Sequence, residues 1–328
     1  MNERLKEITA VILDAEVGYA AVRNACNDLS DFFYEIAAPE KSAPEFDAHI
    51  ETANGLAVAP MSAAFCIIDF MRTQKFLMGI KQAVEDRLQK NKNEPVVILY
   101  AGTGPFATLV IPLTSVFSAS QVQFVLLELN PVSINCLQKM ITALGLQHYI
   151  SALIQADAAS YLIDEKNQPD IIVSETMRPG LMKEPQVSII ANLLPQCIKQ
   201  PVLIPQKIII KTAWAKNKTG TTVDVQLLGT LMEFSEKMAI AINVNMQQER
   251  VLTDGVEQKI LQKPEPAFTT LVLLTEIIVY KKHEIKFNES SLTIPHKIME
   301  VKDIKSFPVR FVFKYGMGKI PGFTFEMF

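Results

Sequence analysis

The chain has 328 residues, 49% of them hydrophobic, and a formal net charge of −3 from 32 basic and 35 acidic side chains. This hydrophobic content suits a folded chain with a sizeable core and excludes extensive disorder. The weak acidic balance, without a block of basic residues, disfavours nucleic acid as the main substrate, because phosphate binding needs a concentrated cationic face.

Cysteine spacing and the length of apolar runs narrow the class further. The four cysteines are widely spaced, without a CxxC pair or a Cys/His cluster of zinc spacing: Cys26, Cys66, Cys136 and Cys197. We therefore expect reduced thiols and no metal site. The N-terminus is charged and no apolar run reaches the roughly 20 residues of a membrane span, which indicates a cytoplasmic protein without a membrane segment. The strand-like alternation of residues 323–328 leaves open whether the natural chain continues beyond Phe328.

Residues 1–90 are predicted to form a helical N-terminal segment. Apolar residues such as Leu5, Ile8 and Ile12 recur at helical spacing, and a helical pattern returns over residues 62–88. Prolines between these stretches divide the segment into pieces.

Residues 91–215 are predicted to form a domain in which short strands alternate with helices. The predicted strands are 96–100, 123–128, 151–155, 170–174 and 206–211, and the predicted helices are 105–118, 131–145 and 184–196. Apolar strands rich in Val, Ile and Leu are typical of a parallel sheet that is buried on both faces. Their alternation with helices predicts a Rossmann-like, doubly wound sheet.

Residues 216–328 change character, because helical periodicity fades and β-rich runs follow. These runs are 270–280, 284–288 and 309–314, with Gly and Pro between them. They predict an antiparallel β domain. The predicted fold class is therefore α/β, with a doubly wound sheet preceded by a helical segment and followed by a β-rich domain.

A glycine-bearing turn follows the first predicted strand. Between Tyr100 and Ala107 the chain places Gly102 and Gly104, which let the backbone turn sharply and approach a ligand. The pattern favours a cofactor that contains adenosine, and it does not separate a dinucleotide from other members of that class. A purely structural tight turn is the alternative.

Two acidic residues follow the next strands at positions that suit the same kind of ligand. Glu128 ends the second strand, 24 residues after Gly104, where a carboxylate can accept hydrogen bonds from the ribose hydroxyls. Asp157 follows the third strand and could reach the adenine amino group. The alternatives are a solvated strand-end carboxylate and an ordinary loop aspartate.

Glu175 and Glu184 lie nine positions apart in the loop after the strand at 170–174. Two carboxylates can hold a guanidinium or ammonium group by charge-assisted hydrogen bonds, and so orient one nitrogen for group transfer. One of them can also assist proton removal. We therefore predict that both glutamates are catalytic. The alternatives are a solvated loop glutamate and a charge near a helix N-terminus.

Taken in order, the glycine turn and the acids after the second and third strands resemble the class I S-adenosylmethionine-dependent methyltransferases, over about residues 66–215. The segment from Asp69 to Phe76, D-F-M-R-T-Q-K-F, is similar to the D-x-x-R-T-x-x-(Y/F) segment of the protein arginine methyltransferases. Glu175 and Glu184 resemble the double-glutamate loop of that family, and the β-rich region is similar to its barrel.

The resemblance implies a barrel-like C-terminal domain, a homodimer and S-adenosylmethionine as cofactor. It also implies that Arg72 grips the carboxylate of this cofactor, for which a guanidinium is well shaped. The cofactor-binding residues expected on all these grounds are Arg72, Tyr100, Gly102, Gly104, Glu128 and Asp157.

The substrate loop departs from the pattern of that family, which has an aromatic residue and then Met-Gly-Tyr after the first glutamate. Here Thr176, Met177, Arg178 and Pro179 follow Glu175. Met177 and Arg178 are therefore expected to bind substrate in a rebuilt site. The charge of Arg178 would repel a guanidinium unless it faces a substrate carboxylate. The Thr-His-Trp loop of the family is not found either.

Two functional hypotheses fit these residues best. The first is N-methylation of a guanidino or amino group of a small molecule, such as free arginine or a biosynthetic intermediate, and Arg178 favours it. The alternative is a divergent protein or peptide arginine N-methyltransferase. A non-catalytic cofactor-binding protein is disfavoured by the presence of both Arg72 and the glutamate pair, and a Rossmann oxidoreductase would leave the same residues unexplained.

Overall fold

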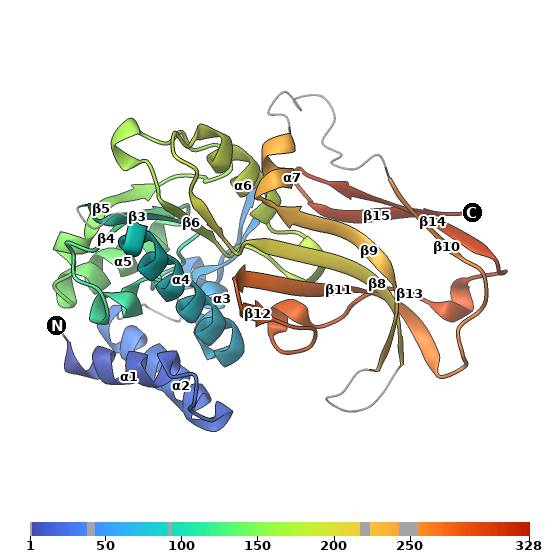
Figure 1. The fold of residues 1–328 in the computed structure, drawn as a ribbon, viewed down its shortest axis with the longest axis horizontal. Coiled ribbons are helices and arrows are strands. Elements are labelled where there is room, and N and C mark those ends of the chain that lie inside the picture. Colours follow the sequence, from blue (N-terminus) through green and yellow to red (C-terminus); the bar gives the residue numbers. More distant parts are fainter. Residues whose placement is uncertain (1, 38–42, 91–93, 217–223, 243–254) are drawn as a thin grey trace.

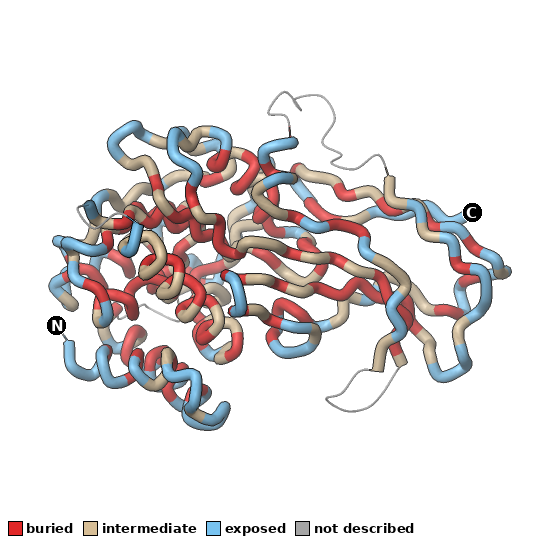
Figure 2. Tube along the Cα trace, viewed as in Figure 1, coloured by how far each residue is buried: buried red, intermediate tan, exposed pale blue. Residues whose placement is uncertain are grey.

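The computed structural model describes residues 2–37, 43–90, 94–216, 224–242 and 255–328. A parallel sheet covered by helices lies beside two antiparallel sheets (Figure 1). Buried residues run through both parts, and one apolar cluster connects them (Figure 2). This arrangement confirms the predicted fold class. The division of the chain into three domains, at residues 90 and 215, stays a prediction.

The parallel sheet brings the predicted site residues to one edge. Its strands are β3 Val96–Ala101, β4 Val122–Glu128, β5 Ile150–Gln155, β6 Ile171–Ser174 and β7 Val202–Ile204. They pair in the order β5-β4-β3-β6-β7, all in parallel. Because the direction of winding reverses between β3 and β6, the loops that follow these strands diverge and leave a crevice at their carboxyl ends. The glycine turn follows β3, Glu128 ends β4, and the loop with the paired glutamates follows β6.

The helices cover the sheet with apolar faces. They are α1 Glu3–Leu13, α2 Tyr19–Ala37, α3 Pro60–Phe65, α4 Phe70–Lys90, α5 Pro131–Ala143 and α6 Gln186–Leu193. Helix α2 contacts α1, α4 and α5, and its Leu29 and Phe33 are fully buried. Helix α5 begins where Asn130 Oδ1 accepts a hydrogen bond from Val132 N at 2.9 Å, which satisfies a free N–H of the first turn.

The helix predicted at 105–118 is wrong. The segment forms turns and then a short 3₁₀ helix, η3 Ile111–Ser115. Pro105 and Pro112 have no backbone N–H to donate, and Ala107 adopts a left-handed φ of 42°. The glycine turn is therefore followed by irregular backbone and not by an α-helix.

The predicted strand at 206–211 is a strand of a different sheet. It is part of β8 Lys207–Lys216, which pairs antiparallel with β9 Val225–Ser235 and β11 Phe268–Tyr280. The short β7 takes the fifth place in the parallel sheet instead. The chain therefore changes sheets at Pro205 and Gln206.

The N-terminal segment also contains a hairpin where only helices are predicted. Strands β1 Ile50–Thr52 and β2 Gly55–Ala57 pair with each other. The hairpin lies on the loop that carries the glutamates, because Leu56 N donates to Lys183 O at 2.8 Å. A Cβ at Gly55 would come within 3.0 Å of Lys183 O, so this close approach requires glycine.

The C-terminal region is antiparallel, as predicted. One sheet has the order β12-β11-β8-β9, with β13 also on β11, and the other has the order β10-β14-β15. The remaining α-helix and strands are α7 Glu236–Ala241, β10 Val256–Ile260, β12 His283–Ile285, β13 His296–Glu300, β14 Val309–Gly316 and β15 Gly322–Met327, and the 3₁₀ helix η8 spans Ser291–Thr293. Trp214, Phe311 and Tyr315 are buried in the core of this region.

The antiparallel region holds the glutamate loop by hydrogen bonds. Thr275 Oγ1 of β11 accepts from Gly180 N at 2.8 Å, and Tyr315 Oη of β14 donates to Leu181 O at 2.8 Å. Both bonds are buried. The loop is therefore positioned by the second part of the chain as well as by β6. Within the described segments, none of the helices combines the length and apolarity that crossing a bilayer requires.

The contact between Thr275 and Gly180 can be tested by an isosteric change. We expect Thr275→Val to lower the free energy of unfolding by about 1–3 kcal/mol, because it leaves the buried Gly180 N–H without an acceptor. Thr275→Ser keeps the hydroxyl and should lower it by less than about 1 kcal/mol. Urea denaturation measures both. A Val variant as stable as the Ser variant would contradict this role.

Candidate active site

All ten predicted site residues line one cavity of about 310 Å³. They come from the start of α4, from the ends of β3 and β4, from the loop after β5 and from the loop after β6: Arg72, Tyr100, Gly102, Gly104, Glu128, Asp157, Glu175, Met177, Arg178 and Glu184. The structure thus brings together every residue that the sequence singled out. Their functional roles remain predictions.

The glycine turn directly touches the glutamate loop. Gly102 and Gly104 have φ angles of 75° and 62°, in the left-handed region that favours glycine. A Cβ at Gly102 would collide with Cγ2 of Thr176, and one at Gly104 would come within 3.0 Å of Cβ of Ala63. The turn therefore exposes backbone to the cavity because no side chain fits there.

Glu128 stabilises the glycine turn from the end of β4. Its Oε2 accepts from Gly104 N at 2.7 Å and its Oε1 accepts from Asn130 N at 2.8 Å. Burial raises the pKa of this carboxyl, and the backbone hydrogen bonds partly offset that shift. Thr103 Oγ1 also donates to Oε2, at 3.4 Å, and the Leu129 N–H is a further backbone donor, so each of the roughly four lone-pair sites of the carboxylate has a donor within the chain. Asp157 is half-buried beside it and accepts from Ala159 N at 2.9 Å.

Glu175 is paired with Arg72 on the other side of the cavity. The two side chains form an ion pair and are 5% and 11% exposed. Glu175 Oε2 accepts a hydrogen bond from Arg72 Nη2. Glu175 Oε1 is buried and has no hydrogen-bond partner among the described residues. Arg72 is positioned by Asp69 at the start of α4, whose Oδ1 accepts from Arg72 N and whose Oδ2 accepts from Ser290 Oγ at 2.7 Å.

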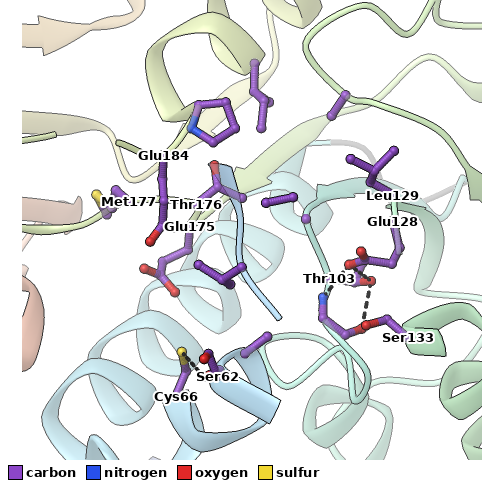
Figure 3. A pocket seen from close by; sticks show the side chains of 18 of the residues that line it. Ser62, Cys66, Thr103, Glu128, Leu129, Ser133, Glu175, Thr176, Met177 and Glu184 are labelled. Atoms are coloured by element: carbon purple, nitrogen blue, oxygen red, sulfur yellow. Dashed lines mark hydrogen bonds between the residues drawn. The ribbon is translucent and has the colours of Figure 1, made fainter. Parts of the chain in front are cut away.

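Glu184 forms a second ion pair within its own loop. Arg178 Nε donates to Glu184 Oε1 at 2.8 Å. Burial is the main effect on Glu184 and raises its pKa, while the bond to Arg178 acts in the opposite direction. In Figure 3 the carboxyl ends of Glu175 and Glu184 point into the same part of the cavity, and Glu128 with Thr103 lies across from them.

Gln186, which no sequence pattern indicated, fixes the start of the loop. Its Oε1 accepts from Thr176 N at 2.9 Å and from Ser174 Oγ at 3.1 Å, and its Nε2 donates to Ser174 O at 2.9 Å. The side chain is 1% exposed. A long polar side chain at the start of the mainly apolar helix α6 is the sequence signal that could have indicated it.

The hairpin and helix α3 also contribute unpredicted lining residues. The hairpin supplies Thr52, Leu56 and Ala57, and the segment after it supplies Ser62 and Cys66. The Asn54–Gly55 pair is a turn signal that could have revealed the hairpin. In the described part of the chain, no three His, Cys, Asp or Glu side chains are grouped as metal ligands.

Comparison with known proteins identifies the fold by structure and not by sequence. No family model and no curated protein matches the sequence. The structure is similar to the PRMT1 enzyme–prozyme heterotetrameric complex with AdoHcy from Trypanosoma brucei, at 12% identity and a TM-score of 0.51, over 80% of this chain and 96% of that chain. It is also similar to PRMT6 (12%, TM-score 0.56, 82% and 99%) and to PRMT6 with SAH (12%, TM-score 0.54, 82% and 100%).

These likenesses show that the chain has the fold of the PRMT structures. In this chain that fold consists of a five-stranded parallel sheet followed by an antiparallel β-rich region. At 12% identity the likeness concerns the fold. The chemistry of the site has to be argued from the residues of this chain.

Gln186 should be a structural anchor of the site. We expect Gln186→Leu to lower the free energy of unfolding by about 2–4 kcal/mol, because it leaves buried polar groups of Ser174 and Thr176 without partners. The matched control is Gln138→Leu on the exposed face of α5, which should change it by less than about 0.5 kcal/mol. Thermal and urea denaturation measure both. Equal effects would refute the anchoring role.

The ionisation of Glu184 should be visible in the pH dependence of stability. Its folded-state pKa is raised above the ordinary value of 4.5, so the folded protein holds this proton more tightly than the unfolded chain does. The resulting stabilisation is complete below the ordinary pKa and is lost as pH rises through the raised one. We therefore expect the free energy of unfolding of the wild type, relative to Glu184→Gln, to fall from acid pH towards neutrality. Glu257→Gln, at a side chain that is 54% exposed on the surface of the antiparallel region, is measured in the same way as the reference variant.

Proposed function

We propose that this protein is an S-adenosylmethionine-dependent N-methyltransferase that acts on a guanidino or amino group of a small molecule. One observation supports this most strongly. A single cavity has the glycine turn and Glu128 on one side and the carboxylates of Glu175 and Glu184 on the other. A binding site for an adenosine-containing cofactor thus adjoins a site for a nitrogen group.

The cavity residues fit S-adenosylmethionine. Gly102 and Gly104 expose backbone at the carboxyl end of β3, where such cofactors approach the sheet. Glu128 lines the cavity, where a ribose hydroxyl would take the place of the long hydrogen bond from Thr103 Oγ1, and Asp157 would meet the adenine amino group. Arg72 lines the cavity with a guanidinium suited to the cofactor carboxylate. Two of the similar structures contain AdoHcy or SAH, names for S-adenosylhomocysteine, which supports the same assignment.

The paired glutamates would orient the acceptor nitrogen. S-adenosylmethionine, when bound, supplies a methyl group on a sulfonium sulfur, and a nitrogen lone pair can attack this methyl group and displace the sulfur. Glu175 Oε1 is a buried acceptor without a partner in the described residues, so it can receive an N–H of the acceptor. The raised pKa of Glu184 makes its carboxylate a better proton acceptor than an exposed glutamate. Orientation by two carboxylates is then the main contribution of this chain.

The hairpin favours a small acceptor. Its strand β2 is hydrogen-bonded to the glutamate loop through Leu56, and Thr52, Leu56 and Ala57 form part of the cavity wall. One side of the site is therefore covered by the chain itself. The alternative is a divergent protein or peptide arginine N-methyltransferase, which the likeness to PRMT structures supports. A cytoplasmic location and a homodimer remain proposals from the sequence.

The proposal predicts cofactor binding and methyl transfer by the purified protein. We expect S-adenosylmethionine to bind in isothermal titration calorimetry. Mass spectrometry should show a methyl-sized gain on a guanidine or amine, in a panel of free arginine, related guanidines, amines and arginine-containing peptides. A gain in peptides only would favour the alternative function. Absence of cofactor binding would remove the proposal.

Glu175 is the residue whose change should separate chemistry from binding. Glu175→Gln should reduce turnover by at least about 100-fold, because the neutral amide holds the acceptor nitrogen poorly. Cofactor affinity should change by less than about threefold. Glu233→Gln, an exposed glutamate on β9, is the control and should leave both unchanged. Turnover retained in Glu175→Gln would exclude the two-carboxylate mechanism.

A further inference from the structure

The acceptor end of the cavity is balanced in charge. Glu175 is paired with Arg72, and Glu184 is paired with Arg178 at 2.8 Å. A ligand that carries only a positive charge must either share the Glu184 carboxylate with Arg178, against the repulsion between the two cations, or displace Arg178. That exchange replaces one guanidinium–carboxylate pair by another and leaves Arg178 without a counter-ion. It therefore gains little binding free energy.

The two members of the Arg178–Glu184 pair are buried to different degrees. The Glu184 side chain is 10% exposed, whereas that of Arg178 is 40% exposed. Glu184 cannot lose its partner without leaving a buried charge unpaired. Arg178 can move with little change in solvation, because its guanidinium already contacts solvent. The mobile half of the pair is therefore the cation.

Both ion pairs of the site have unused hydrogen-bonding capacity. A guanidinium has five N–H donors, and within the described residues Arg178 uses its Nε–H on Glu184. In the same part of the cavity, Glu175 Oε1 is a buried acceptor to which no described residue donates. The site thus offers free donors and a free acceptor to one ligand, which suits a molecule that carries both charges.

We propose that the acceptor molecule carries a carboxylate in addition to the nitrogen that is methylated, and that Arg178 leaves Glu184 to pair with this carboxylate. The inference rests on the proposed function and names its substrate class, an amino acid or a similar zwitterion. Glu184 and Glu175 Oε1 then hold the nitrogen group. One internal ion pair is replaced by two ion pairs with the ligand, which a ligand without the carboxylate cannot form. Arg178 is thereby the residue that determines specificity.

The test compares ligands that differ only in the carboxylate. The pairs are L-arginine with agmatine, and L-lysine with cadaverine, the second member of each being the decarboxylated analogue. Binding is measured by calorimetry with and without S-adenosylhomocysteine, and methyl transfer by mass spectrometry. In at least one pair we expect the wild type to prefer the carboxylate-bearing member by about 10-fold or more, as a charge-assisted pair would provide.

Variants of Arg178 distinguish this role from a structural one. Arg178→Gln should reduce the preference to about threefold or less. Binding of the carboxylate-bearing ligand should weaken, and binding of its decarboxylated analogue should become tighter, because Glu184 then has no guanidinium partner. If Arg178 had only a structural role, its substitution would not make the decarboxylated analogue bind more tightly. Arg178→Lys should keep part of the preference. The matched control, Arg310→Gln, changes an exposed arginine on β14 that pairs with Glu257 outside the cavity, and should keep all of it.

Several outcomes would overturn the inference. They are equal binding of both members of each pair by the wild type, no binding of any of the four compounds, an unchanged preference in Arg178→Gln, and a methyl group found on Arg178 itself. Failure of the proposed function has a different signature, because S-adenosylhomocysteine would not bind. The preference between the two members of a pair is measured by binding in either case.

Discussion

The buried amide of Gln186 determines where strand β6 ends and where the glutamate loop begins. Its oxygen accepts from Thr176 N and its nitrogen donates to Ser174 O, so the backbone on both sides of Glu175 is held by one side chain. Since Gln186 also begins α6, the strand, the loop and the helix are connected at one point. An amide that both donates and accepts is satisfied in this position, which is why it can be buried without a large penalty.

The rest of the loop is held by parts of the chain that are distant in sequence. Thr275 and Tyr315 bind it from the antiparallel region, and the hairpin binds it through Leu56. The site therefore lies between the parallel sheet and the β-rich region, and it depends on how these parts pack. The carboxyl edge of such a sheet occurs in many proteins, and here the hairpin and the antiparallel region give the cavity at this edge its particular shape.

Electrostatics in the cavity follow from burial. Of the four charged groups, Arg72, Glu175 and Glu184 are nearly buried while Arg178 still contacts solvent, and each carboxylate of the pair has a guanidinium partner. Isolated charges in such a place would be strongly destabilising, whereas paired ones are tolerated. Pairing also reduces the attraction that two free glutamates would exert on a lone cation. For this reason the residues between Glu175 and Glu184 matter as much to the choice of substrate as the glutamates do.

The sequence by itself determined four strands of the parallel sheet and ten of the residues that line the cavity. Predicted strands from 96–100 to 170–174 match β3 to β6 within one residue at each end, because apolar runs and strand-end polar residues are local features. The glycine turn, Glu128 and the paired glutamates were found in the same way. Only the tertiary structure decided that residues 207–216 join another sheet, that a hairpin lies on the loop, and that Gln186 anchors it.

The pairing of charges was likewise decided only by the tertiary structure. Arg72 and Glu175 are 103 positions apart, and nothing in the sequence near either one indicates the other. Arg178 and Glu184 are close in sequence, but their contact depends on a turn with a left-handed Gly180, whose N–H is bound by Thr275. Residue type at a strand end is a local property, whereas the partner of a buried charge depends on how distant segments pack together.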